Sequence, residues 1–348
     1  MGLGLNLRRA LGAVAMLGAL ALPGLTQAQQ APVNTLEAIR ARGALICGVN
    51  TGLAGFAQPD SQGVWRGFDI DYCKSIAVAI FNDASKVRYV PTTAQSRFTA
   101  LQSGEVDVLY RNTTWTLSRD TSLGLDFPTV NFYDGQGFMV KASTGLKSAL
   151  ELNGATICVQ PGTTTEQNLS DWARANHISF TPVVIERLEE LVAAYVAGRC
   201  DAYTTDASGL AATRAAQPTP ADHVILPEVI SKEPLGPAVR QGDARFADIV
   251  RWTHFAMLVA EELNITAANA DQALASDQRP EALRLLGKTG DLGKMLGLDN
   301  AWALNVIKAV GNYGEVFNRH LAPIGLQRAH SPNAMWTQGG LQYAPPFR

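Results

Sequence analysis

The feature that most constrains the fold is a pattern that occurs twice, in the same order, in the two halves of the chain. Gly43-Ala44-Leu45-Ile46-Cys47 is similar to Gly154-Ala155-Thr156-Ile157-Cys158, and the stretch Gly104–Leu109 is similar to Gly198–Tyr203. Each matched segment is short, so chance similarity remains the alternative. The shared order favours one structural plan that is used twice.

Around these motifs, short apolar runs alternate with stretches whose apolar residues recur at helical spacing. The runs predict strands at Leu45–Val49, Val87–Val90, Val106–Tyr110, Thr156–Gln160, Ser179–Ile185 and Cys200–Thr204. Cys73, Ile76 and Ile80 are typical of the helices between them. This alternation predicts an α/β fold of parallel-type sheets flanked by helices. Further helices are predicted within 240–263, 280–286 and 303–310, and an irregular tail follows from residue 320.

Composition sets the broad class of the protein. The chain has 348 residues, of which 47% are hydrophobic and 17% are charged, as in ordinary globular proteins. This length suggests about two domains. The formal net charge is −2, so the chain lacks the basic surface that nucleic-acid binding requires, and no nucleic-acid partner is expected.

The first 28 residues have the layout of a secretory signal peptide. Arg8 and Arg9 form a basic head, residues 10–22 are apolar, and small residues end at Ala28. A membrane anchor is the alternative, although the apolar run is short for a bilayer span. We expect cleavage near Gln29 and export of the mature chain.

Export makes the four cysteines informative, because exported proteins form disulfides. Cys47, Cys73, Cys158 and Cys200 allow three pairings. The repeat places Cys158 and Cys200 on neighbouring strands, and Cys47 on a strand that precedes the helix of Cys73. We therefore hypothesise the pairs Cys47–Cys73 and Cys158–Cys200. The chain has no CxxC motif and its histidines lack metal-ligand spacing, so neither a metal nor a cofactor is expected.

Polar residues follow three of the predicted strands, where parallel α/β sheets bind ligands. Arg119 offers a planar guanidinium that matches a carboxylate. Thr163 or Thr164 opens a helix whose free N–H groups favour an anion, and Glu166 would complete a capping box with Thr163. Asp206 could pair with an ammonium group. Together these residues complement a zwitterion. The alternatives are that Arg119 is a surface arginine, that Asp206 caps the helix after it, and that the threonine run is only a helix start.

At these residues the sequence resembles a known family. Gly67-Phe68-Asp69-Ile70-Asp71, followed by a helix of small residues, is similar to the signature of family 3 extracellular solute-binding proteins, with Tyr72 as one departure. The segments SGEVDVL, RNTTWTLSRD, CVQPGTTTE, AGRCDAYTTDASGL and GNYGEVFNRH resemble the general L-amino-acid-binding subfamily. The resemblance covers nearly all of the mature chain.

The resemblance implies a two-lobed periplasmic-binding-protein clamshell with two hinge crossings, and a monomer by default. We expect crossings near Gln136–Val140 and Ser231–Leu235. Lobe 1 would comprise residues 29–138 and 235–348, and lobe 2 would comprise residues 139–234.

The family's binding roles transfer by motif position. Arg119 would hold the α-carboxylate of an amino acid, and Thr114 would give its amide or hydroxyl to the same ligand. Asn112 would offer its backbone carbonyl to the α-ammonium. Thr164 would supply a helix-end amide from lobe 2, and Asp206 would pair with the α-ammonium.

Residues that would select the ligand's side chain are predicted from the same loops. Asn50, Leu53 and Phe56 follow the first strand and could line the wall. Arg97 and Arg111 lie near this region and would suit acidic or amide side chains. The alternative is that both arginines point outward or form salt bridges.

The function implied by the resemblance is that of a periplasmic substrate-binding protein for an ABC importer. It would bind glutamate, glutamine, aspartate, asparagine or a broader set of polar L-amino acids, and deliver them to inner-membrane permease subunits. An enzyme on the same fold, such as a periplasmic cyclohexadienyl dehydratase, is the alternative. That activity would need an acid or base facing the cleft, and capping already explains Glu166, the nearest candidate. We therefore do not expect an enzyme.

Overall fold

A computed structural model describes Met1 and residues 34–348, so residues 2–28 of the predicted signal peptide lie outside the described residues. The strands are β1 Leu45–Asn50, β2 Gln58–Pro59, β3 Trp65–Arg66, β4 Val87–Thr92, β5 Val108–Thr114, β6 Leu125–Asp126, β7 Phe132–Asp134, β8 Gln136–Lys141, β9 Thr156–Val159, β10 Thr181–Val184, β11 Ala202–Asp206, β12 His223–Ile225 and β13 Glu233–Arg240. The α-helices are α1 Thr35–Arg42, α2 Phe68–Phe81, α3 Arg97–Gln102, α4 Leu117–Ser122, α5 Thr164–Ala175, α6 Leu188–Val196, α7 Ala207–Ala215, α8 Ala244–Glu262, α9 Ala270–Ser276, α10 Pro280–Leu285, α11 Leu292–Met295, α12 Trp302–Ala309 and α13 Tyr313–His320. Short 3₁₀ helices are η1 Ala142–Thr144, η2 Ala149–Glu151, η3 Pro220–Asp222, η4 Ala322–Ile324 and η5 Trp336–Gln338.

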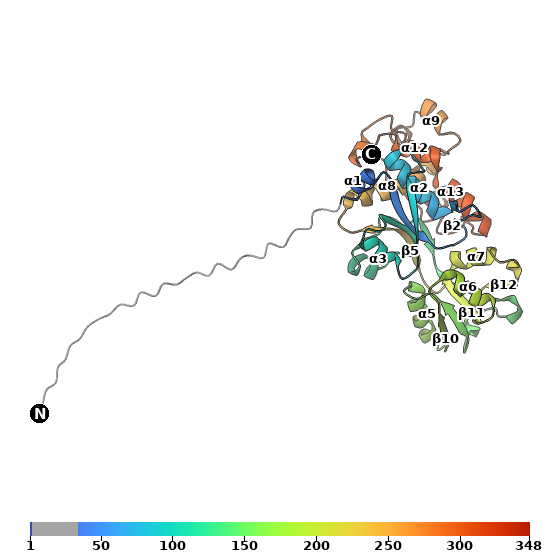
Figure 1. The fold of residues 1–348 in the computed structure, drawn as a ribbon. Coiled ribbons are helices and arrows are strands. Elements are labelled where there is room, and N and C mark those ends of the chain that lie inside the picture. Colours follow the sequence, from blue (N-terminus) through green and yellow to red (C-terminus); the bar gives the residue numbers. More distant parts are fainter. Residues whose placement is uncertain (2–33) are drawn as a thin grey trace. The chain divides into compact units, whose positions relative to one another are not determined.

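The strands form two larger sheets, which define the two lobes of the α/β fold. The sheet of lobe 1 has the order β4-β1-β5-β13-β6, with β7 also paired to β13, and the sheet of lobe 2 has the order β10-β9-β11-β8-β12. Helices α2, α8 and α12 pack together on lobe 1, and α5, α6 and α7 pack on the strands of lobe 2 (Figure 1). Among the described residues, no helix is both long enough and apolar enough to cross a membrane.

The parallel core of each sheet agrees with the sequence prediction, but both sheets are mixed. Strand β1 is parallel to β4 and β5, and β9 is parallel to β10 and β11. In contrast, β13 is antiparallel to β5, and β8 is antiparallel to β11. These two strands were not predicted. Each enters its sheet directly from the other lobe, without the crossover helix that keeps successive strands parallel.

The chain crosses between the sheets twice, and the two crossings lie side by side. The first crossing is at Gly135, between β7 and β8, and the second lies between β12 and β13. The backbone N–H of Ile230 donates to the carbonyl of Gln136 at 2.9 Å. The first crossing therefore precedes the predicted segment Gln136–Val140, because that segment is part of β8. The predicted lobe bounds fall within β8 and β13, and they stay a prediction.

Helix α2 carries the family-like signature and anchors the core of lobe 1. It begins directly after Gly67, whose φ is 137°. A Cβ at this position would lie 2.1 Å from the carbonyl oxygen of Phe56, so only glycine fits. Tyr72 is fully buried, and its hydroxyl lies 2.8 Å from Nδ1 of His254 on α8. The departure from the signature is thus accommodated by packing.

One disulfide lies in each lobe, with the pairing that the repeat predicted. Cys47 of β1 is bonded to Cys73 of α2, with the Cα atoms 6.1 Å apart. Cys158 of β9 is bonded to Cys200, which lies two residues before β11, with the Cα atoms 5.6 Å apart. All four sulfur atoms are buried in residues at most 2% exposed.

The segment after His320 is irregular, as predicted, and it returns to the hinge region. The side chain of Asn333 accepts from the backbone N–H of Tyr133 at 2.7 Å and donates to its carbonyl at 2.8 Å. Tyr133 belongs to β7, directly before the first crossing. Near the end of the chain, Phe347 packs edge-on against Trp252. The tail therefore braces a strand that leads into the hinge.

Candidate functional site

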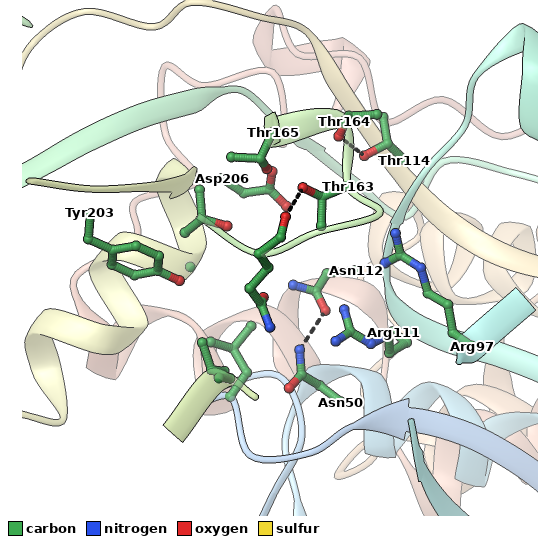
Figure 2. Close-up of a pocket in the computed structure, with 15 residues that line it drawn as sticks. Asn50, Arg97, Arg111, Asn112, Thr114, Thr163, Thr164, Thr165, Tyr203 and Asp206 are labelled. Atoms are coloured by element: carbon green, nitrogen blue, oxygen red, sulfur yellow. Dashed lines mark hydrogen bonds between the residues drawn. The ribbon is translucent and has the colours of Figure 1, made fainter. Parts of the chain in front are cut away.

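A cavity lies between the two lobes, at the carboxyl ends of the central parallel strands. Its empty volume is about 450 Å³, including space open to solvent. It is lined from lobe 1 by Asn50, Leu53, Arg97, Arg111, Asn112 and Thr114, and from lobe 2 by Gln160, Thr163, Thr164, Thr165, Leu188, Tyr203, Thr205, Asp206 and Gly209 (Figure 2). Of the predicted ligand residues, only Arg119 and Phe56 are absent from this lining.

Two lining segments belong to strands rather than to the loops that the sequence predicted. Strand β5 extends to Thr114, because β13 pairs with it as far as the Leu235–Thr114 position. Strand β11 extends to Asp206, which pairs with Gln136 of β8. Local sequence could not reveal these antiparallel partners. Their pairing holds the polar residues in fixed strand geometry.

The lobe 1 wall carries two buried arginines. Arg97 is 3% exposed and Arg111 is 4% exposed, and neither forms an ion pair among the described residues. Burial lowers the pKa of Arg111 to about 10 and lowers that of Arg97 as well. Nε of Arg111 donates to the carbonyl of Thr92 at 3.2 Å, whereas Nε of Arg97 has no partner. The sequence alternative of outward or salt-bridged arginines is therefore not what the structure shows.

Arg119 is not among the residues that line the cavity, but it adjoins the lobe 1 wall. It belongs to α4 and is 7% exposed. Its Nη1 donates to the carbonyl of Thr114 at 2.9 Å, and its guanidinium lies over the ring of Phe98 at 5.0 Å. Arg119 is therefore not a surface arginine. It contacts the backbone of a residue that lines the cavity.

On the lobe 2 wall, Asp206 does not cap the helix that follows it. It occupies the N-cap position of α7 but makes no capping hydrogen bond. Instead the backbone N–H of Ser208 donates to the carboxylate of Asp134, at 3.3 Å from the nearer oxygen. The Asp206 carboxyl faces the cavity, and burial together with Asp134 and Glu233 raises its pKa well above the ordinary value. An uncompensated carboxylate in this place favours a cation as its partner.

The N-terminus of α5 is the third part of the cavity. Thr163 is the N-cap residue, and its hydroxyl accepts from the backbone N–H of Glu166 at 3.2 Å. Glu166 accepts from the backbone N–H of Gly162 at 3.2 Å, so the predicted capping box with Thr163 does not form. The helix start nevertheless places Thr164 and Thr165 on the cavity wall.

Asn112 adopts an unusual backbone conformation at the cavity, with φ at 32°. Nδ2 of Asn50 donates to Oδ1 of Asn112 at 3.1 Å, so the two asparagines restrain each other. Behind them, the backbone N–H of Asn112 donates to the carboxylate of Asp69, whose pKa burial raises to about 7. Positive φ is uncommon outside glycine, and it occurs here at a position predicted to bind a ligand through its carbonyl.

Phe56 is a core residue and does not line the cavity, contrary to its predicted place in the wall. It is 1% exposed, and its ring packs edge-on against Phe68 and Phe132, with centroids 6.1 and 5.7 Å away. The aromatic side chain buries more apolar area in this cluster than it would on a polar wall. Leu53 and Asn50 line the cavity instead.

Several lining residues were not predicted from the sequence. Tyr203 and Thr205 lie on the same side of β11, because side chains alternate along a strand, and this spacing could have identified them. Leu188 begins α6 and Gly209 lies in α7, and neither carries a local signal. Among the described residues, no group of three or more His, Cys, Asp or Glu side chains could hold a metal ion.

Comparison with known proteins agrees with this architecture. Residues 45–276 match the model of bacterial extracellular solute-binding proteins, family 3. The chain is 58% identical over 335 residues to the glutamate/glutamine/aspartate/asparagine-binding protein BztA of Rhodobacter capsulatus, covering 96% of this chain and 99% of that protein. It is 56% identical over 324 residues to the general L-amino acid-binding periplasmic protein AapJ of Rhizobium johnstonii, covering 92% and 95%.

A solved structure extends the likeness to three dimensions. An ABC transporter periplasmic binding protein from Brucella ovis with glutathione bound has a TM-score of 0.88 and 57% sequence identity, over 91% of this chain and all of that one. The matched family model covers both sheets and the cavity between them. The chain therefore belongs to the bacterial extracellular solute-binding proteins of family 3.

Proposed function

We propose that this protein is the periplasmic substrate-binding protein of an ABC importer for polar L-amino acids. The observation that carries the proposal is the charge arrangement in one interlobe cavity. Buried arginines come from lobe 1, and a buried carboxylate with no capping role comes from lobe 2. A zwitterionic amino acid supplies the counter-charge that each wall lacks.

The α-groups of the ligand contact both lobes in this proposal. Arg119 and the amides at the start of α5, including that of Thr164, hold the α-carboxylate. Thr114 contacts the same ligand, and Asp206 with the carbonyl of Asn112 receives the α-ammonium. Arg119 uses one of its five donors on Thr114, so other donors remain for a ligand.

The side chain of the ligand lies toward Asn50, Leu53, Arg97 and Arg111. Two uncompensated guanidinium groups favour acidic and amide side chains, in line with the ligands named for the Rhodobacter relative. Glutathione, which is bound in the Brucella relative, carries the same α-amino acid group at its γ-glutamyl end. We therefore include glutathione among the candidate ligands.

Delivery follows from lobe closure in this proposal. A ligand that contacts both walls stabilises the closed arrangement, which docks on inner-membrane permease subunits. The two lobes move relative to each other about the two crossings, in a monomer located in the periplasm. In this proposal the protein binds and releases its ligand by closing and opening its lobes, and it catalyses no covalent step.

Calorimetric titration tests this proposal. Mature protein is unfolded, freed of copurified ligand, refolded and titrated with glutamate, glutamine, aspartate, asparagine and glutathione. We expect about one ligand bound per chain for at least one of them. No binding across the panel would overturn the proposal. Turnover of prephenate or arogenate would instead favour the dehydratase alternative.

A further inference from the structure

Glu233 is the first residue of β13, directly after the second crossing, and it is 1% exposed. It does not line the cavity. Sequence analysis gave it no role, and the proposed function does not use it. Its carboxylate nevertheless lies behind two cavity residues, one from each lobe.

Four side-chain donors converge on this carboxylate. Oε2 accepts from the hydroxyl of Thr114 at 2.6 Å and from the hydroxyl of Thr164 at 3.0 Å. Oε1 accepts from the hydroxyl of Ser231 at 2.6 Å and from Nδ2 of Asn168 at 2.7 Å. Thr114 belongs to lobe 1, whereas Thr164 and Asn168 belong to α5 of lobe 2. The carboxylate thus joins both lobes at the hinge.

These contacts fix which way the threonine protons point. A hydroxyl has one proton, and a carboxylate without a proton can only accept hydrogen bonds. Since both hydroxyls donate to the same oxygen of Glu233, neither has a proton left for the cavity. The two threonine oxygens lie 3.5 Å from each other, the contact dashed in Figure 2, and each lies nearer to Glu233, so both protons point to the carboxylate. Because both threonines line the cavity, the remaining lone pairs of their oxygens can accept hydrogen bonds from a ligand.

We infer that Glu233 is a positioning residue that turns the hydroxyl protons of Thr114 and Thr164 away from the cavity, so that their oxygens accept hydrogen bonds from the α-ammonium group of the ligand. This inference rests on the proposed function. It makes the Thr114 hydroxyl an acceptor, so that the α-carboxylate is held by backbone N–H groups and Arg119 instead. Glu233 acts through the threonines and does not touch the ligand.

A double-mutant cycle in the mature protein tests this role, with glutamate affinity measured by calorimetry. Glu233→Leu removes every acceptor, and Thr114→Val removes the hydroxyl through which Glu233 acts. We expect E233L to weaken glutamate binding about tenfold or more in the wild-type background, as for loss of a hydrogen bond to a charged group. In the T114V background, E233L should weaken binding less than about threefold, because Thr164 alone remains to be oriented.

Two further variants separate positioning from general support of the hinge. Ser231→Ala removes a donor on the other carboxylate oxygen and should leave affinity within about twofold. If E233L does not fold, Glu233→Gln takes its place in the cycle, because the amide retains one accepting oxygen. Equal losses from the Glu233 variant in both backgrounds would overturn the inference. Failure of the wild-type protein to bind any amino acid would instead overturn the proposed function.

Discussion

The lobe 1 wall and the lobe 2 wall of the cavity differ in the sign of their buried charge. Arg97 and Arg111 line the first wall and Arg119 adjoins it, whereas Asp206 lines the second and interacts with Asp134, which ends β7 at the first crossing. Burial shifts the pKa of every one of these groups toward its neutral form. Elsewhere, buried Asp71 contacts His320, Lys74 and Arg319, and the contacts with His320 and Lys74 lower its pKa to about 2 in spite of burial.

This difference distinguishes charged groups that stabilise the fold from charged groups that are available to a ligand. Asp71 and its partners neutralise one another within lobe 1, so that cluster is complete without a ligand. The cavity charges are divided between lobes and lack ion-pair partners among the described residues. Such an arrangement costs stability in the unliganded protein, and a zwitterion relieves that cost when the lobes close on it.

Among the variants proposed here, Arg119→Ala should have the largest effect on amino acid affinity. It leaves the ligand's α-carboxylate desolvated without its guanidinium partner, so amino acid affinity should fall by several kcal/mol, about 100-fold or more. Calorimetry with glutamate measures the loss. Arg66→Ala is the matched control, because Arg66 pairs with Asp60 away from the cavity. Unchanged binding by the Arg119 variant would remove it from the site.

Asp206→Asn should be the next largest change, since it removes the charge of the lobe 2 wall. We expect a loss of about 2–4 kcal/mol in amino acid affinity, because the α-ammonium keeps only neutral acceptors. Thermal shift in the absence and presence of each ligand of the panel measures this loss of affinity. Wild-type affinity in this variant would mean that the ammonium is bound elsewhere.

Arg97→Leu should affect selectivity more than overall affinity. Loss of this guanidinium should weaken glutamate and aspartate about tenfold more than glutamine and asparagine, because only the acidic ligands carry a side-chain charge. Competition binding with the four ligands gives the ratio. Arg111→Leu tests the second guanidinium in the same competition experiment. An equal effect on all four ligands would exclude Arg97 from selection.

The smallest expected effect is on the stability of the ligand-free protein. Burial raises the pKa of Asp206 and raises that of Asp134 to about 6, so the folded state binds protons that the unfolded chain has released. Its free energy of unfolding should therefore fall as pH rises from about 4 through these raised values.

Asp206→Asn should remove part of this pH dependence. We expect the ligand-free variant to be more stable than wild type at pH 7.5, by about 1 kcal/mol, and less so at pH 5. Urea unfolding at the two pH values measures this difference. A variant that is less stable than wild type at pH 7.5 would contradict the assignment of Asp206 as a desolvated carboxyl.

Much of the site could be predicted from sequence because it lies at strand ends in a repeated βαβ plan. The polar residues at the ends of β1 and β5 and after β9 follow apolar runs that are visible locally, and most of them line the cavity. The prediction of Phe56 as a wall residue was wrong because its position depends on packing against Phe68 and Phe132, which lie elsewhere in the chain. Glu233 was missed because its four partners come from three separate segments.

By itself the sequence determined the two-lobed α/β class, the family, the disulfide pairing and the kind of polar groups at the cavity. The α/β class follows from local periodicity, and the pairing from a repeat between the two halves of the chain. The family follows from local motifs, and the two-lobed form is what the resemblance to that family implies. Only the tertiary structure decided that β8 and β13 run antiparallel, that Asp134 rather than Asp206 caps α7, and that Glu233 joins both lobes. Those outcomes depend on contacts between segments that are distant in the chain, and no local pattern specifies which donor reaches which acceptor.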